Sequence, residues 1–176
     1  MHPDTVTFWI KYLLRMATLI LEPTRVTQNT GASQVAWSLT SAPQGREDYN
    51  RCGTVRALKT VSGISDTETT GELLWAGYST TATGTLTAIQ IRVYASKQSR
   101  IADHTIKLTV DGTATGSNLA RTDSGNDYLY SAVIPNGITL NTINRLGVLT
   151  QYRNGAVPHC DHCYVDTVWL KLTYTP

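Results

Sequence analysis

The residues best suited to chemistry lie together near the C-terminus, in the run Pro158–Cys163. This run holds four potential soft-metal ligands: His159, Cys160, His162 and Cys163. A Cys-x-x-Cys pair can chelate zinc, although structural zinc sites usually take a second ligand pair from a distant part of the chain. The run precedes a predicted strand, whereas a redox-active Cys-x-x-Cys opens a helix. We therefore expect no cofactor, and zinc is the alternative that this cluster leaves open.

The cysteine count leaves several states open. There are three cysteines, Cys52, Cys160 and Cys163, and an odd number cannot form a closed set of disulfides within one chain. Cys160 could bridge to Cys163, Cys52 could bridge to either of them, or one thiol could bridge to another chain. Free thiols are the remaining alternative.

Signatures of catalysis are absent from the sequence. The chain has no Gly-x-Ser-x-Gly nucleophile motif, no phosphate-binding loop and no dinucleotide fingerprint. Asp103, expected at the end of a loop, and Asp166, expected at the start of the last strand, do not form an evident catalytic pair. We expect both carboxylates to bind loop backbone amides, with a shared calcium ion as the alternative. The sequence thus predicts a protein that is not an enzyme.

Composition favours strands and argues against several partners. The 176 residues suit one domain, and they include 28 threonines, which pack well on a pleated sheet and disfavour helices. Charged residues make up 16% of the chain, and the net charge is +2 without a basic cluster, so no nucleic-acid partner is expected. No apolar run reaches about 18 residues, so no membrane span is predicted.

Apolar and polar residues alternate in short segments, which is typical of half-buried strands. Together with frequent turn signals, such as Asp111-Gly112 and Asn136-Gly137, this predicts an all-β fold: an antiparallel β-sandwich, jelly-roll-like, of about eight strands. One helical turn is expected at 140–145, capped by Asn141. The strongest predicted strands are 35–39, 86–94, 105–110 and 165–174, and weaker ones are 18–22, 55–59, 73–78, 128–134 and 146–152.

Aromatic residues suggest two kinds of contact. In the last predicted strand, Trp169 falls on the face opposite Val168 and Leu170, so an indole would point outward. It would be either open as a contact surface or covered by a loop or by the N-terminal segment. Trp75, Tyr78 and Tyr94 could form a sugar-binding platform or pack between strands. We expect packing for these three.

The N-terminal segment is predicted to be separate from the sandwich. Residues 1–15 are expected to form a short helical or extended arm and residues 16–176 the β-sandwich domain, with Met16 as an alternative start. Phe8, Trp9, Tyr12 and Leu13 could share one face of a short helix. This face would dock either on its own domain or on a neighbouring subunit.

From about Glu72 to Tyr174 the sequence resembles a domain of the structural proteins of tailed bacteriophages and prophages. Six pieces agree in order and spacing, beginning with an Ile-x-x-Ile-x-Val type strand and ending with a Val-Asp-x-Val strand. Two features depart from this pattern: the middle, at 122–131, is short, and the His/Cys cluster is additional. The matching pieces are Leu86–Val93, Ile101–Asp103, Ile106–Leu108, Gly116–Ala120, Leu146–Val148 and Val165–Val168 with Tyr174-Thr175.

This resemblance implies a non-enzymatic virion protein, most directly a capsid decoration or cement subunit, or else a neck, collar or tail accessory subunit. It would act through contacts with copies of itself and with major capsid or tail proteins, as a homo-oligomer located in the virion. Asp103 and Asp166 match recurring positions, which implies a shared role in bracing loops. The alternative is a carbohydrate-binding, receptor-binding jelly-roll module.

Overall fold

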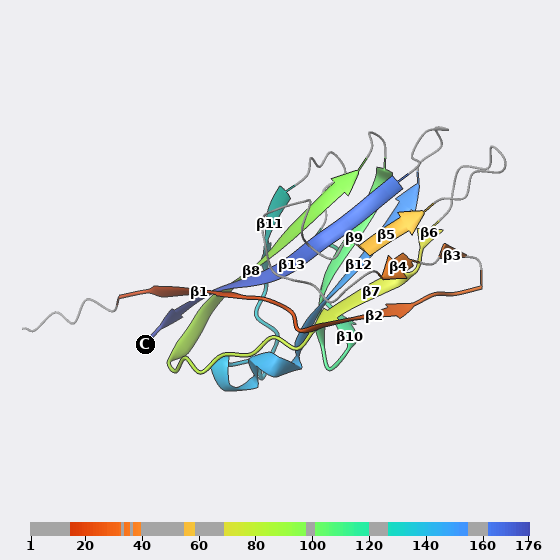
Figure 1. Ribbon diagram of the computed structural model, residues 1–176. Coiled ribbons are helices and arrows are strands. Elements are labelled where there is room, and N and C mark those ends of the chain that lie inside the picture. The colour runs from red at the N-terminus through yellow and green to blue at the C-terminus, as the bar shows by residue number, and fades with distance from the viewer. Residues whose placement is uncertain are drawn as a thin grey trace, which may run out of the picture.

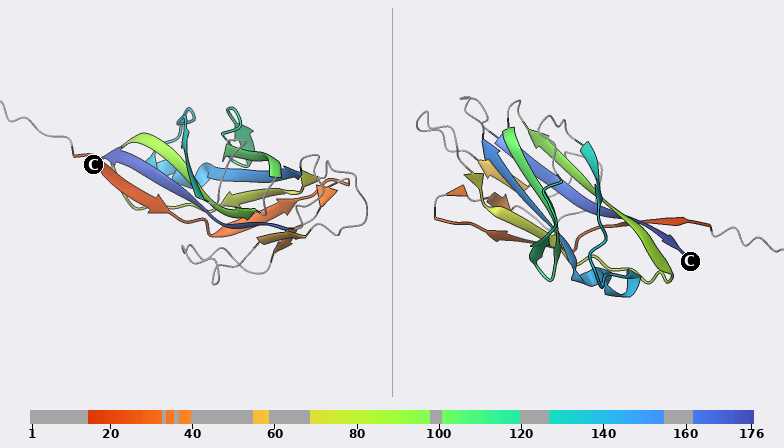
Figure 2. Two further views of the ribbon diagram at one scale, coloured as in Figure 1. Left: turned by 90° about the horizontal axis from the view of Figure 1, so that it is seen from above. Right: turned by 180° about the vertical axis from the view of Figure 1, so that it is seen from behind.

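The chain folds into two β-sheets packed face to face. Figure 1 shows the computed structural model, which describes residues 15–32, 34–35, 37–39, 55–58, 69–97, 101–119, 127–154 and 162–176. In both views of Figure 2, the long strands β8 and β13 run side by side. The described strands are β1 (Ala17–Leu21), β2 (Arg25–Asn29), β3 (Gln34–Val35), β4 (Trp37–Leu39), β5 (Val55–Leu58), β6 (Thr69–Thr70), β7 (Glu72–Ala76), β8 (Thr85–Lys97), β9 (Ile101–Val110), β10 (Thr113–Thr115), β11 (Asp127–Ala132), β12 (Leu146–Asn154) and β13 (His162–Thr175).

The connectivity confirms the predicted all-β, antiparallel sandwich. Sheet A has the order β11-β8-β13-β5-β4, with β1 also paired to β13. Sheet B has the order β10-β9-β12-β6-β3, with β7 paired to both β12 and β2. Consecutive strands repeatedly belong to different sheets, as in a jelly roll. Among the described pairs, only β3 and β6 run parallel.

Every predicted strand has a counterpart, and the described residues add four short ones: β2, β3, β6 and β10. The predicted hairpin at Asp111-Gly112 joins β9 to β10, with positive φ angles of 50° and 82° at its two central residues. Positive φ at both positions is the geometry that favours Asp-Gly in tight hairpins.

The core lies between the sheets and contains the apolar face of each long strand. Sheet A contributes Ile91 from β8 and Leu170 from β13, and sheet B contributes Leu73 from β7 and Ile106 from β9; all four are fully buried. Removing such side chains from water is the main favourable contribution to folding. The sequence pattern predicts the inward positions of Ile91, Ile106 and Leu170, because side chains alternate between the two faces of a strand.

A β-bulge in β13 changes the alternation at one place. The register against β8 shifts between Val165 and Thr167, so that Asp166 lies at the bulge. Val165 and Val168 are both buried although they are three residues apart. The extra residue lets the strand keep both valines in the core.

The 3-10 helix η1 (Leu140–Arg145) closes one end of the sandwich, with Leu140 and Ile143 buried. The predicted helical turn is confirmed, but its predicted cap is wrong. Thr139, in an extended conformation, is the N-cap, and its backbone N–H donates to Thr142 Oγ1 at 2.9 Å. Asn141 therefore lies inside the helix and not before it.

Two fully buried threonines offer a matched test of core hydrogen bonding. Trp75 Nε1 donates to Thr150 Oγ1 at 3.0 Å, whereas Thr109 Oγ1 is buried with no hydrogen-bond partner among the described residues. Thr150→Val should lower the free energy of unfolding by about 1–3 kcal/mol, because it leaves the indole N–H unsatisfied. Thr109→Val should leave that free energy unchanged or raise it. Urea unfolding of both variants measures this, and equal losses would contradict it.

The β9–β10 hairpin is joined to the end of η1 by an ion pair. Arg145 Nε donates to Asp111 Oδ2 at 3.0 Å, and the Asp111 N–H donates to the Arg145 carbonyl at 2.8 Å. The hydrogen bonds from Arg145 hold the pKa of Asp111 below its ordinary value of 3.8. A carboxyl group whose pKa is lowered by folding stabilises the folded state at pH values above its ordinary pKa. This contribution is lost as the pH falls towards the folded-state pKa.

Asp111→Asn should therefore lower the melting temperature slightly at pH 7, because asparagine keeps the left-handed turn but loses the charge. The difference from the parent should shrink as the pH falls below 3.8. Thermal melts across this pH range measure it. A difference that grows on acidification would contradict this assignment.

Candidate functional site

The candidate site lies on the outer face of sheet A, around Trp169. Val168 and Leu170, its neighbours on β13, belong to the core, so Trp169 occupies the opposite face. Its partner across the β13–β8 pair is Arg92, which lies between the core residues Ile91 and Val93. The sequence prediction that Trp169 faces away from the core is confirmed.

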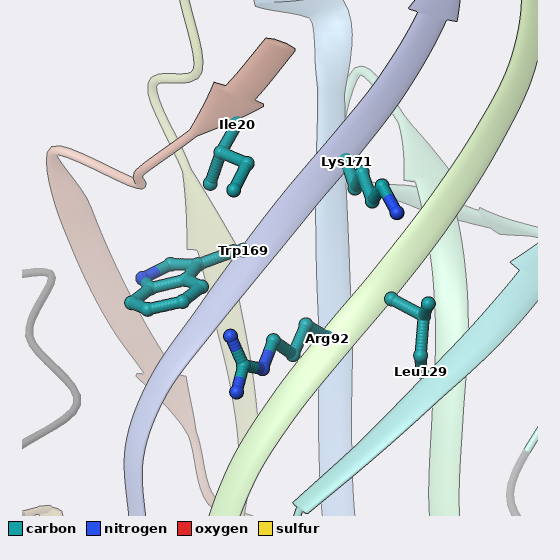
Figure 3. Close-up of a pocket in the computed structure, with 5 residues that line it drawn as sticks. All are labelled: Ile20, Arg92, Leu129, Trp169 and Lys171. Carbon is teal, nitrogen blue, oxygen red and sulfur yellow. The ribbon is translucent and has the colours of Figure 1, made fainter. Parts of the chain in front are cut away.

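Pairing extends this position into a row across four strands. Leu129 of β11 pairs with Arg92 of β8, and Ile20 of β1 pairs with Lys171 of β13. Together with Trp169, these side chains line an open hollow of about 360 Å³ (Figure 3). Ile20 is 53% exposed and Leu129 47% exposed, so the two ends of the row present apolar surface to solvent.

Arg92 covers the indole of Trp169. Its Cζ atom lies 5.0 Å from the centroid of the ring, within the range of a cation–π interaction, which contributes on the order of 0.5–2 kcal/mol. Figure 3 shows the guanidinium beside the ring, with Ile20 on the neighbouring strand. Trp169 is only 7% exposed, so it does not form an open aromatic surface. The expected cover was a loop or the N-terminal segment, and the described contact over the ring comes from Arg92 on the neighbouring strand β8.

The indole N–H of Trp169 is an unusual feature of this face. Nε1 is buried and has no hydrogen-bond partner among the described residues. An unsatisfied buried donor costs about 1–3 kcal/mol, which packing and the cation–π contact must offset. The outer face therefore carries a local energetic cost at Trp169.

The chemistry of the hollow suits binding. Two of its five lining side chains, Arg92 and Lys171, are cationic, and three are apolar or aromatic. None is a carboxylate, thiol, imidazole or hydroxyl, and the amine of Lys171 is the one group among these five side chains that could act as a nucleophile or a general base. Across the described residues more widely, no group of three or more His, Cys, Asp or Glu side chains is placed to hold a metal ion.

Most residues predicted for the site fall outside what the structure describes. The backbone of four others is described, but their side chains are not: Asp103 in β9, and His162, Cys163 and Asp166 in β13. Asp103 and Asp166 lie inside these strands, so the predicted starts of both strands were wrong. The roles predicted for these residues in bracing loops, bonding disulfides or binding zinc remain predictions. The predicted residues outside the described ranges are Phe8, Trp9, Tyr12, Leu13, Cys52, His159 and Cys160.

Two of the three aromatic residues weighed as a sugar platform, Trp75 and Tyr78, are part of the core. Trp75 and Tyr78 are both 0% exposed, and the Tyr78 hydroxyl donates to the Val168 carbonyl at 2.9 Å. Burial raises the pKa of Tyr78 well above its ordinary value. The expected packing role is confirmed for these two residues, and the side chain of Tyr94 is not described.

The sequence analysis missed four residues that line the hollow: Ile20, Arg92, Leu129 and Lys171. The two-residue period did place Arg92 and Lys171 on outward faces. What it lacked was the pairing that brings β1, β13, β8 and β11 together.

Within the described residues, no helix is long and apolar enough to cross a membrane.

Comparisons with known proteins identify no family. No family model matches the chain, and no curated protein matches it. Among solved structures, the chain is similar to a low-affinity xylan-binding module, CBM86, from Roseburia intestinalis, with a TM-score of 0.35 and 11% identity over 90% of this chain and 94% of that one. At a TM-score this low, the similarity does not bear on the function of this chain.

Removing the Arg92 side chain should open the indole to solvent. We expect Arg92→Ala to increase acrylamide quenching of the Trp169 emission, because the guanidinium covers the ring. The Trp169 emission is isolated by difference: the spectrum of the matching protein with Trp169→Phe, which contains only the other tryptophans, is subtracted from each spectrum. Unchanged quenching would show that other groups cover the ring.

Proposed function

We propose that the protein is a non-enzymatic structural subunit of a tailed-bacteriophage virion. Its most direct role is capsid decoration or cement, and a neck, collar or tail accessory position is the second. It binds copies of itself and other virion proteins. The ordered series of motifs from Glu72 to Tyr174 supports this proposal, because five of its six pieces lie in described strands of the β-sandwich: β8, β9, β12 and β13.

The single observation that carries the proposal is the row of side chains across the outer face of sheet A. Ile20 and Leu129 are large, apolar and about half exposed, and they flank a cationic and aromatic centre. Exposed apolar patches on folded domains mark interaction surfaces, and Arg and Trp are enriched where protein interfaces gain most of their affinity. A lattice or ring subunit needs such a surface to bind its neighbours.

The carbohydrate-binding alternative depends on an aromatic side chain that can stack on a sugar ring. Trp75 and Tyr78 cannot do so because they are buried. Trp169 reaches the outer face, but Arg92 covers its ring. The described side chains on this face therefore favour protein contacts over stacking on sugars.

A virion subunit should be present in purified particles in many copies. Quantitative mass spectrometry of gradient-purified virions should detect the chain at a constant ratio to the major capsid protein, and particle micrographs should show its density on the capsid, neck or tail. Absence from purified particles would end the virion proposal. Glycan-array binding by the purified protein, abolished by Trp169→Ala, would instead support the carbohydrate-binding alternative.

A further inference from the structure

The strand β1 lies at an edge of sheet A. Among the described residues it pairs with β13 alone, from Ala17 opposite Tyr174 to Leu21 opposite Leu170, and the register is continuous over all five residues. Figure 1 shows β1 beside the C-terminal part of β13. Within the described part of the chain, no residue of β1 makes a hydrogen bond other than those of this pairing. The other side of β1 therefore presents backbone N–H and C=O groups to which a further strand can bind.

This strand carries none of the features that usually prevent edge pairing. Natural edges are blunted by charged side chains, proline, bulges or very short strands. The sequence of β1 is ATLIL, without a charge, a proline or a register shift. By contrast, the edge strands β4 and β10 are only three residues long, and β2 and β11 contain Arg25 and Asp127. Of the described strands at sheet edges, β1 is thus the one best suited to pairing.

The two faces of β1 define what a further strand must offer. Leu21 is 6% exposed and Leu19 packs against the core, whereas Ile20 is 53% exposed. Because strand side chains alternate, Ala17, Leu19 and Leu21 share the inward face, and Thr18 and Ile20 share the outer face. A strand added beside β1 must therefore be apolar on its inward face, and β1 itself meets this requirement.

We propose that β1 pairs antiparallel with β1 of a second copy of this chain, about a two-fold axis at Leu19. Residues directly opposite in an antiparallel pair share one face of the sheet, so the axis must coincide with a residue position. With the axis at Leu19, every residue of the strand has a counterpart. An axis at any other residue of β1 leaves residues of the strand without one.

This register matches the side chains on both faces of the sheet. On the inward face, Ala17 lies opposite Leu21 of the partner subunit, a small residue against a large one, and Leu19 lies opposite the partner subunit's Leu19. On the outer face, Thr18 lies opposite Ile20 of the partner subunit. The result is a sheet that continues through two subunits, with its apolar face still directed inward.

The charges at the two ends of β1 favour a second copy as the occupant. Arg15 precedes the strand and Glu22 follows it, and both side chains are exposed. Among the described residues, neither has an ion-pair partner. In an antiparallel pair of identical strands, the start of one strand lies beside the end of the other, so Arg15 of each copy meets Glu22 of the partner subunit. The pair places opposite charges together at both ends and keeps its centre uncharged.

The sequence before β1 is less suited to this edge than a second copy is. A segment that pairs with the next strand along the chain needs a tight turn, which is usually built from glycine, proline, asparagine or aspartate. Residues 5–16 contain none of these four residue types. The sequence therefore offers no hairpin turn by which residues 1–14 would pair with β1.

The contact area indicates a weak dimer in solution. A single short strand from each copy buries less than the roughly 1,200 Å² at which stable standard interfaces begin. A dissociation constant on the order of micromolar or weaker is therefore expected for the free protein. Repetition of the same contact around a particle would strengthen it by multivalency. The pairing deepens the proposed function, on which it rests for its role in the particle.

Sedimentation velocity of the full chain, from about 1 to 100 μM, tests the pairing. The parent should show a concentration-dependent dimer. Thr18→Lys combined with Ile20→Lys should weaken dimerisation at least about tenfold, because like charges then face each other across the axis. Thr18→Lys combined with Ile20→Glu should restore the dimer, because opposite charges then face each other in the same register.

Val133→Lys is the matched control, since Val133 is apolar and 88% exposed but follows β11, at the other side of sheet A. It should leave dimerisation unchanged. A parent that is monomeric at about 100 μM, an equal loss of dimer in Val133→Lys, or no restoration by the opposite charges would each overturn the pairing.

A disulfide test reports the register directly and does not depend on the charged variants. Thr18→Cys and Ile20→Cys are prepared separately and oxidised alone or as a mixture. The mixture should form a bond between position 18 of one chain and position 20 of the other, because directly opposite residues have Cα atoms about 4.5–5.5 Å apart. Either variant alone should cross-link far less, since each new thiol lies two residues out of register with its symmetry mate.

Mass spectrometry of the linked tryptic peptides identifies this bond and separates it from bridges made by the native cysteines. Equal cross-linking in the mixture and in the separate variants would overturn the register, and no cross-link in the mixture would overturn the pairing. A monomeric protein that is still found in purified virions would end the pairing and leave the proposed function intact. A dimer that is absent from virions would end that function and leave the pairing.

Discussion

The pairing of β13 with β8 is the interaction on which the rest of the structure depends. These two long strands are matched from Cys163 opposite Lys97 to Thr175 opposite Thr85. Their inward faces supply much of the buried core, and β1, β5 and β11 attach to one or the other of them. Because side chains alternate along a strand, burying one face of this pair necessarily presents the other face to the outside.

This alternation determines which side chains lie on the outer face of sheet A. Trp169 must point away from the core because Val168 and Leu170 point into it. Arg92 lies beside the indole because the register pairs these two residues. The result combines a covered aromatic, two cations and apolar ends, which is a composition suited to contact with another protein surface.

The same geometry connects the face to the edge of the sheet. Leu129 belongs both to the row that lines the hollow and to strand β11, which stands at the end of the order of sheet A.

Local sequence was sufficient for the elements and their faces. The two-residue period predicted the long strands and their buried positions, such as Ile91 and Leu170, and Asp111-Gly112 predicted the tight hairpin. These features depend on residues close together in the chain, where side-chain alternation and backbone conformation act directly. The covering of Trp169, the bulge at Asp166 and the exposed edge at Leu129 could not be obtained in this way. Each depends on which distant strands become neighbours and in what register, and that is decided by the packing of two complete sheets around one core.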